Sequence, residues 1–199
     1  PDASGVDNQI WDYLLRNYVD SGLVDYDGMA KDYLFTTYLR QLAGADPTKL
    51  ATPEEKLALH CNAYNALVIH GVIKHKIHRN ERNVLQFAPK DIAAKVETLD
   101  QEIEMLKRTP NADPLAITQL LQKADSLRKQ TQFFSIEEYI FANQTISLDH
   151  LEHTIIRPTF QEPRIHVALV CAAKSCPAIR GEAYMGDRIE AQLEDQAKQ

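Results

Sequence analysis

The sequence has no apolar run approaching the ~18–20 residues that cross a bilayer, which excludes an integral membrane helix. It has only three cysteines, so at most one internal disulfide can form and a disulfide-built scaffold is excluded. Seven glycines and nine prolines are too few for a collagen-like or linker-dominated chain. With 44% hydrophobic and 25% charged residues, the chain has the composition of a globular protein.

Basic residues are also in deficit, because 22 Lys and Arg stand against 28 Asp and Glu, for a net charge of −6. A general nucleic-acid binder or a polybasic membrane-surface protein needs the opposite balance, so neither is expected. Glycine-rich phosphate loops and the Gly-x-Ser-x-Gly nucleophile motif are absent. The length suits one domain over residues 1–199 with a core of its own.

Helical spacing of apolar residues dominates the first part of the chain. It predicts amphipathic helices over residues 7–18 and 33–42. A third helix start is marked by Thr52 as N-cap, Pro53 at the first position and Glu55 as the second half of a capping box. The apolar pattern that follows, to about residue 76, predicts a central buried helix.

Residues 90–130 have a different pattern. A first apolar set repeats at alternating steps of four and three, which is a heptad seam: Ile92, Val96, Leu99, Ile103 and Leu106. A second set follows a proline-containing break: Ile117, Leu120, Leu121, Ala124 and Leu127. Two helices of similar length joined by such a turn form an antiparallel hairpin. We therefore predict a helical hairpin inserted at 90–130, either projecting from the domain or folded onto it.

The last part of the chain contains the clearest strand pattern, residues 164–171. It is rich in β-branched residues, mostly apolar and bounded by Pro163. Ser147 is predicted to cap a helix over 148–156 that Pro158 stops, and a final helix begins at about Asp187. The predicted fold class is α+β: a helix-rich single domain with a small antiparallel sheet that includes residues 165–170, and the inserted hairpin.

Four blocks of the sequence resemble, in order, a family of bacteria and plants, the domain of unknown function 547. The blocks are YVDSGLVDYDGM from Tyr18, EEKLALHCNAYNALVIHGVI from Glu54, ISLDHLEHTIIRP from Ile146, and PRIHVALVCAAKSCPAIRGEAY from Pro163. The resemblance covers about residues 18–184. It implies a domain without an assigned activity that is often exported in bacteria, so we expect a secreted or periplasmic protein.

The chain departs from the family pattern in two places. His60, within Leu59-His60-Cys61, stands where the family usually has Phe-Trp-Ile. Family members also continue past the last helix with further strands, so the resemblance implies a terminal piece beyond Gln199.

Cys176, in a Ser-Cys-Pro motif after the predicted strand, is the first candidate for chemistry. If the following proline opens a helix, Cys176 is its N-cap, where the helix dipole stabilises a thiolate. His166 upstream is the candidate base, and Glu152 or Asn65 the group that orients its imidazole. The alternatives are a disulfide or redox pair with Cys171, and a packing role.

Polar residues on two predicted helices are further candidates. His153 and Arg157, beside Glu152, are four residues apart and share a helix face, so His153 is a second candidate acid or base. The alternative is a polar cluster that anchors the helix. Asn62 and Asn65 lie inside an apolar helix, where an amide needs hydrogen-bond partners. Three roles are open to these two amides: binding a substrate, donating a hydrogen bond to an oxyanion, or holding the backbone of a loop.

Residue types that bind zinc are present, but their spacing is poor. Cys171 and Cys176 are at the wide end for a zinc pair, and no second cysteine pair exists. His75 and His78 form a pair on a helix end without an evident third ligand. We therefore expect no metal and no other cofactor.

These observations lead to three hypotheses of different classes. The first is a thiol-dependent hydrolase or acyl transferase that acts on a peptide- or amide-like substrate, with Cys176 as nucleophile and His166 as base. The second is a non-catalytic module that binds a protein partner through the hairpin at 90–130. The third is a redox protein that cycles Cys171 and Cys176.

Overall fold

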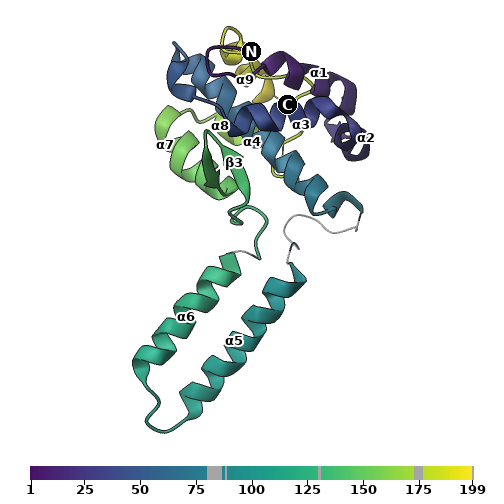
Figure 1. Cartoon of the computed structure of the whole chain (residues 1–199). Helices are drawn as coiled ribbons and strands as arrows, with labels where there is room; N and C mark the ends of the chain where they lie inside the picture. Colours follow the sequence, from purple (N-terminus) through teal and green to yellow (C-terminus); the bar gives the residue numbers. More distant parts are fainter. Residues whose placement is uncertain (80–86, 88, 130, 173–176, 199) are drawn as a thin grey trace.

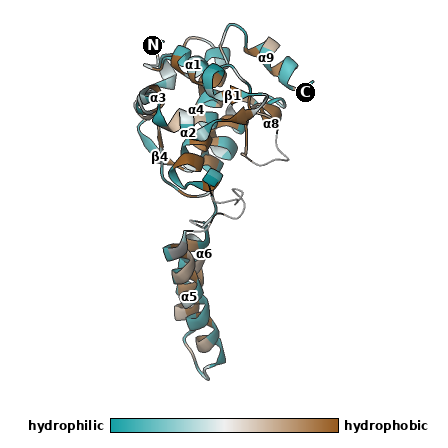
Figure 2. Ribbon diagram, turned by 90° about the vertical axis from the view of Figure 1, so that its right-hand side faces the viewer, coloured by the Kyte–Doolittle hydropathy of each residue, from teal (hydrophilic) through white to brown (hydrophobic). Residues whose placement is uncertain are grey.

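The computed structural model describes residues 1–79, 87, 89–129, 131–172 and 177–198. They form a helical body, which holds both chain ends, and a two-helix hairpin that extends away from it (Figure 1). The hairpin has the same place in a view turned by 90° (Figure 2). The described strands form two small antiparallel sheets among many helices, so the helix-rich α+β class is confirmed.

The N-terminal part begins with a capped helix, α1 (Asn8–Tyr18). The Asp7 carboxylate accepts a hydrogen bond from the Gln9 N–H, which satisfies one of the free donors of the first turn. Trp11 of α1 is fully buried and stacks on Tyr38 at 5.3 Å between ring centroids. The elements that follow are β1 (Val19–Asp20), β2 (Leu23–Val24), α2 (Tyr26–Lys31), α3 (Tyr33–Ala43) and the one-turn η1 (Pro47–Lys49).

The long helix α4 (Pro53–Lys74) runs through the centre of the body. The Thr52 hydroxyl accepts from the Glu55 N–H at 3.1 Å, and the Glu55 carboxylate accepts from the Thr52 N–H at 3.0 Å. The predicted capping box is therefore confirmed. Every residue from 57 to 69 is buried, and α4 contacts α1, α2 and α3. A one-turn helix, η2 (Ile77–Arg79), follows it.

The hairpin consists of α5 (Lys90–Arg108) and α6 (Pro114–Lys129), which pack against each other. Its buried residues are Leu99, Ile103 and Ala124, with Leu120 and Leu127 partly buried beside them. This cluster is separate from the core of the body. Leu121 is 41% exposed, so its predicted place in the seam is wrong. It follows Leu120 directly, and adjacent helix positions do not face the same partner.

The chain returns to the body through a β-hairpin, β3 (Tyr139–Phe141) and β4 (Gln144–Ile146), and the π-helix η4 (His150–Ile156), which leads into α7 (Arg157–Phe160). The prediction that Pro158 stops the helix is wrong, because the helix continues to Phe160. The Arg157 N–H donates to the Glu152 carbonyl five residues back. This widened turn shifts the hydrogen-bond ladder immediately before Pro158, which has no N–H to donate.

The prediction of a strand at residues 164–171 is wrong. Residues Ile165–Ala168 form a single helical turn, α8, and Leu169 then extends the chain. The Asn65 side chain takes the main-chain groups that a partner strand would otherwise bind: its Nδ2 donates to the Ala168 carbonyl and its Oδ1 accepts from the Val170 N–H, both at 3.0 Å. The final helix is α9 (Ile189–Gln196), close to its predicted start, and it buries Ile189 and Leu193.

Candidate functional site

The cysteines differ sharply in state. Cys176 lies outside the described residues, so its predicted role as nucleophile stays a prediction. Cys171 is disulfide-bonded. Cys61 is free and fully buried on α4, and burial raises the pKa of its thiol to about 12. Among the described residues, therefore, no cysteine is a free thiol that ionises near neutral pH.

The predicted base, His166, lies exposed on the one-turn helix α8. Its imidazole has no hydrogen bond or ion pair within the part of the chain that the structure describes. Asn65, one of the two groups predicted to orient it, is 3% exposed and spends its amide on the main chain at Ala168 and Val170. Asn65 thus holds the segment that follows His166 and does not orient the imidazole.

Glu152, the other predicted orienting group, belongs to a cluster on the π-helix. Its Oε1 accepts from Arg157 Nε at 2.9 Å and from Arg157 Nη2 at 2.6 Å. His153 is 61% exposed, and its Nε2 lies 4.0 Å from the same oxygen. The π turn places residues five apart on one face, so Glu152 pairs with Arg157 where an α-helix would separate them.

Tyr64 connects this cluster to the central helix. Its pKa is raised well above the usual range, first by burial and then by the charge of Glu152. The hydroxyl therefore remains protonated at neutral pH. A neutral phenol and a carboxylate paired with Arg157 form a link between α4 and η4, and the geometry favours the anchoring role for this cluster.

His60 occupies the position where the sequence departs from the family pattern. Its ring meets Phe141 and Phe160 edge-on, each at 5.3 Å between centroids, and its Nδ1 donates to the Lys56 carbonyl at 2.6 Å. A carbonyl can only accept, so Nδ1 carries the proton. Burial lowers the pKa of the imidazole, and the bond to Lys56 opposes this shift. His60 therefore packs as a neutral aromatic ring.

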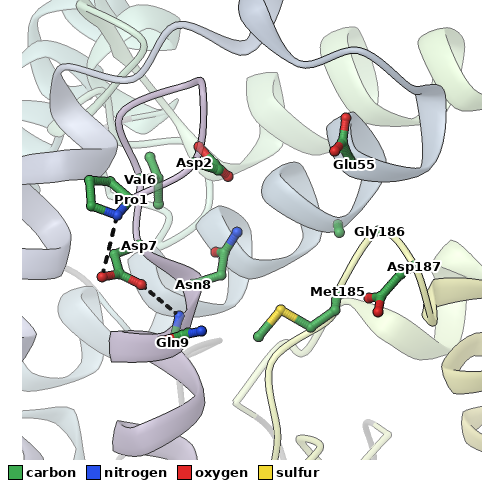
Figure 3. A pocket seen from close by; sticks show the side chains of 11 residues that line it. Pro1, Asp2, Val6, Asp7, Asn8, Gln9, Glu55, Met185, Gly186 and Asp187 are labelled. Carbon is green, nitrogen blue, oxygen red and sulfur yellow. Dashed lines mark hydrogen bonds and ion pairs between the residues drawn. The ribbon is translucent and has the colours of Figure 1, made fainter.

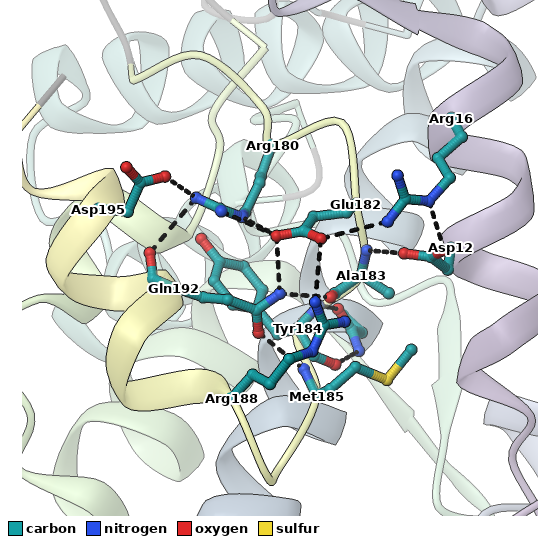
Figure 4. Close-up of polar contacts among 11 residues, drawn as sticks. Asp12, Arg16, Arg180, Glu182, Ala183, Tyr184, Met185, Arg188, Gln192 and Asp195 are labelled. Atoms are coloured by element: carbon teal, nitrogen blue, oxygen red, sulfur yellow. Dashed lines mark hydrogen bonds and ion pairs between the residues drawn. The ribbon is translucent and has the colours of Figure 1, made fainter.

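A polar network around Glu182 fastens the C-terminal part of the body (Figure 4). Glu182 Oε1 accepts from Arg180 Nε at 2.8 Å and from Gln192 Nε2 at 3.1 Å, and Oε2 accepts from Arg16 Nη2 at 3.3 Å. Burial opposes ionisation of Glu182, but the hydrogen bonds from Gln192 and Arg180 and the charges of Arg180 and Arg188 outweigh it and lower its pKa. The network joins α1 and α9, so we assign it a structural role.

A cavity of about 450 Å³ opens between the first residues of the chain, the start of α4 and the loop that contains Met185 (Figure 3). Four acidic residues line it, and three of them accept backbone hydrogen bonds: Asp2 from Ser4, Asp7 from Gln9, and Glu55 from Ala51 and Thr52. These three carboxylates serve local turns and helix starts, and Asp187 is the fourth acidic residue of the lining.

The hairpin surface has unused binding capacity, as do exposed apolar residues of the body such as Leu23 and Tyr33. Met105, Leu115 and Leu121 are 64%, 62% and 41% exposed. A shallow groove of about 570 Å³ lies along α5, lined by Ala93, Val96, Glu97, Asp100, Gln101 and Glu104, with Thr131 beyond the end of α6. Sequence reasoning missed this groove. The available signal was the stripe 93, 97, 100 and 104, which lies beside the heptad seam on one flank of the helix.

A comparison with known proteins identifies the family of the chain. The model of the family described as "Protein of unknown function, DUF547" matches residues 47–199. The chain belongs to this family. The predicted resemblance is thus confirmed, although the first of its four blocks, near Tyr18, lies outside the matched residues. No curated protein and no solved structure matches the chain.

The match extends across the elements described above. It includes the central helix, the hairpin and the C-terminal part of this DUF547 domain. Within the described ranges, no helix is long and apolar enough to cross a membrane. The described His, Cys, Asp and Glu side chains form no group of three that could hold a metal ion.

Proposed function

We propose that this DUF547 domain is a protein-binding module and that the α5–α6 hairpin contacts the partner. One observation carries the proposal: the hairpin has an apolar cluster of its own, separate from the body, and keeps large apolar side chains exposed. Two helices can bury only the seam between them, so their outer faces remain open to a third surface.

The size of the hairpin suits this role. A helix of 19 residues is about 28 Å long at 1.5 Å per residue, so α5 carries the exposed surface well away from the body (Figure 1). Covering a large apolar side chain completely is worth about 1.5–3 kcal/mol. Met105, Leu115 and Leu121 therefore represent a substantial gain of free energy that the isolated chain does not realise.

A photo-crosslinking residue placed in the hairpin tests the proposal in the native cells of the protein. Leu115 and Leu23 form a matched pair, because both are exposed leucines, at 62% and 76%, and Leu23 lies on the body. We expect a protein adduct of defined mass from position 115 and none from position 23. Equal crosslinking from both positions, or none from position 115, contradicts the proposal.

The disulfide at Cys171 favours a second candidate, the redox protein. The test is the reduction potential of this disulfide. A potential between about −120 and −270 mV is typical of proteins that exchange disulfides, whereas a value below about −300 mV identifies a structural disulfide and rejects the redox role. The thiol-enzyme hypothesis requires a free Cys176, which lies outside the described residues, and it is tested by the alkylation experiment in the Discussion.

A further inference from the structure

We infer that the partner of the hairpin presents an amphipathic helix with basic side chains beside its apolar stripe, and that this helix lies along the groove of α5. The inference rests on the proposed function and specifies the chemistry of the partner.

The groove has an apolar floor and an acidic rim. Ala93 and Val96 form the floor, and Glu97, Asp100 and Glu104 carry the carboxylates. Residues 93, 97, 100 and 104 recur at steps of four and three, so they lie on one side of α5. An apolar side chain fits such a floor, and a cation beside it fits the rim.

The same face continues onto α6. Arg128 forms an ion pair with Asp100, so its side chain lies on the groove side of the hairpin. Leu121 precedes Arg128 by seven residues, which places it on the same side of α6. The exposed Leu121 therefore places an apolar side chain on the same side of α6 as Arg128.

The acidic rim is only partly neutralised within the hairpin. Glu104 Oε1 lies 3.1 Å from Lys107 Nζ, and Glu104 Oε2 lies 3.9 Å from Arg108 Nη2. Both ion pairs are exposed and therefore weak. Among the described residues, Glu97 has no ion pair. The groove thus offers a carboxylate without a partner next to apolar surface, which favours lysine or arginine on the incoming helix.

A synthetic peptide of about 18 residues, or five helical turns, is a direct probe. It has leucine at helical spacing and lysine at the other positions, and a second peptide replaces each lysine with glutamate. Binding to the full chain is measured by fluorescence anisotropy. We expect the lysine peptide to bind, more weakly as salt is raised, and the glutamate peptide not to bind. Equal binding of both peptides, or no binding of the lysine peptide, overturns the inference.

Two matched variants locate the site. Glu97 and Glu102 are both exposed residues of α5, neither has an ion pair within the described chain, and five positions place them on different sides of the helix. We expect Glu97→Lys to weaken binding about threefold or more and Glu102→Lys to leave it unchanged. Equal losses in the two variants show non-specific attraction and overturn the inference.

A second copy of the chain is the competing occupant, and light scattering detects it. A stable dimer that Glu97→Lys dissociates assigns the groove to a second copy and overturns the inference of a basic partner. The crosslinking experiment distinguishes failure of the basic-helix inference from failure of the protein-binding role. An adduct at position 115 together with no binding of the lysine peptide rejects the basic helix and leaves the protein-binding role standing.

Discussion

The Asn62 side chain forms two hydrogen bonds with the main chain of Tyr184. Its Nδ2 donates to the Tyr184 carbonyl at 2.8 Å, and its Oδ1 accepts from the Tyr184 N–H at 2.9 Å. The Asn62 side chain is fully buried, so no solvent replaces these bonds. One side chain in the central helix thus fixes a segment 122 positions away.

Removing this amide is expected to destabilise the body strongly. Asn62→Ala leaves two buried main-chain groups unpaired, at about 1–3 kcal/mol each, so we expect a loss of about 2–6 kcal/mol in the free energy of unfolding. Urea unfolding measures it. Asn17→Ala is the control, because the Asn17 amide makes an exposed bond to the Tyr13 carbonyl. Similar losses in both variants would contradict this role for Asn62.

The hairpin is expected to lose structure independently of the body. Leu99→Ala removes a central side chain of the small hairpin cluster, so amide hydrogen exchange should accelerate over residues 90–129 while the body is unaffected. Leu59→Ala, in the core of the body, should instead lower the free energy of unfolding of the body by about 2–5 kcal/mol. If Leu99→Ala lowers the main transition as much as Leu59→Ala does, the two clusters are one cooperative unit.

The buried His60 is expected to make stability depend on pH. Its pKa in the folded protein is below the ordinary value of 6.5, so the unfolded chain binds more protons as the pH falls. Stability is fully present above pH 6.5 and declines below it. His60→Phe should reduce the stability difference between pH 7.5 and 5.5, in part only, since burial also lowers the pKa of His70. The Asn17→Ala variant, which removes no titratable group, should leave that difference unchanged.

The three cysteines are expected to react in different ways with an alkylating agent, mapped by peptide mass across pH. Without reductant, Cys171 should be protected by its disulfide and Cys61 by burial and its raised pKa. Reduction should expose Cys171, and only unfolding should expose Cys61. Fast alkylation of Cys176 in the native, unreduced protein, with an apparent pKa well below 8.5, would support the thiol-enzyme hypothesis. Protection of Cys176 until reduction would reject it.

Features that depend on neighbours in sequence were predictable. The capping box at Thr52 and Glu55 and the hairpin seam through Leu99 and Ile103 follow from cap chemistry and helical spacing, and the structure confirms both. The candidate site was less predictable. Leu121 was assigned to the seam, yet it is exposed, because spacing shows which residues are apolar and not how far two helices can cover them.

The strand predicted at 164–171 shows the limit most clearly. Its β-branched and apolar residues indicate burial, and a short buried segment has the same composition as a strand or as a helical turn. Asn65 decides between them, because its side chain binds the main chain of Ala168 and Val170, which lie 103 and 105 residues further along the sequence.

Amino-acid order alone was enough for the helix starts, the central buried helix, the hairpin and the family, since these depend on local spacing and on motifs. The helical turn at 165–168, the π turn at Glu152 and Arg157, and the open acidic face of α5 required the folded chain. In each of these, a side chain or main-chain group satisfies its hydrogen bonds, charge or apolar contacts by a route that residue type and spacing do not specify.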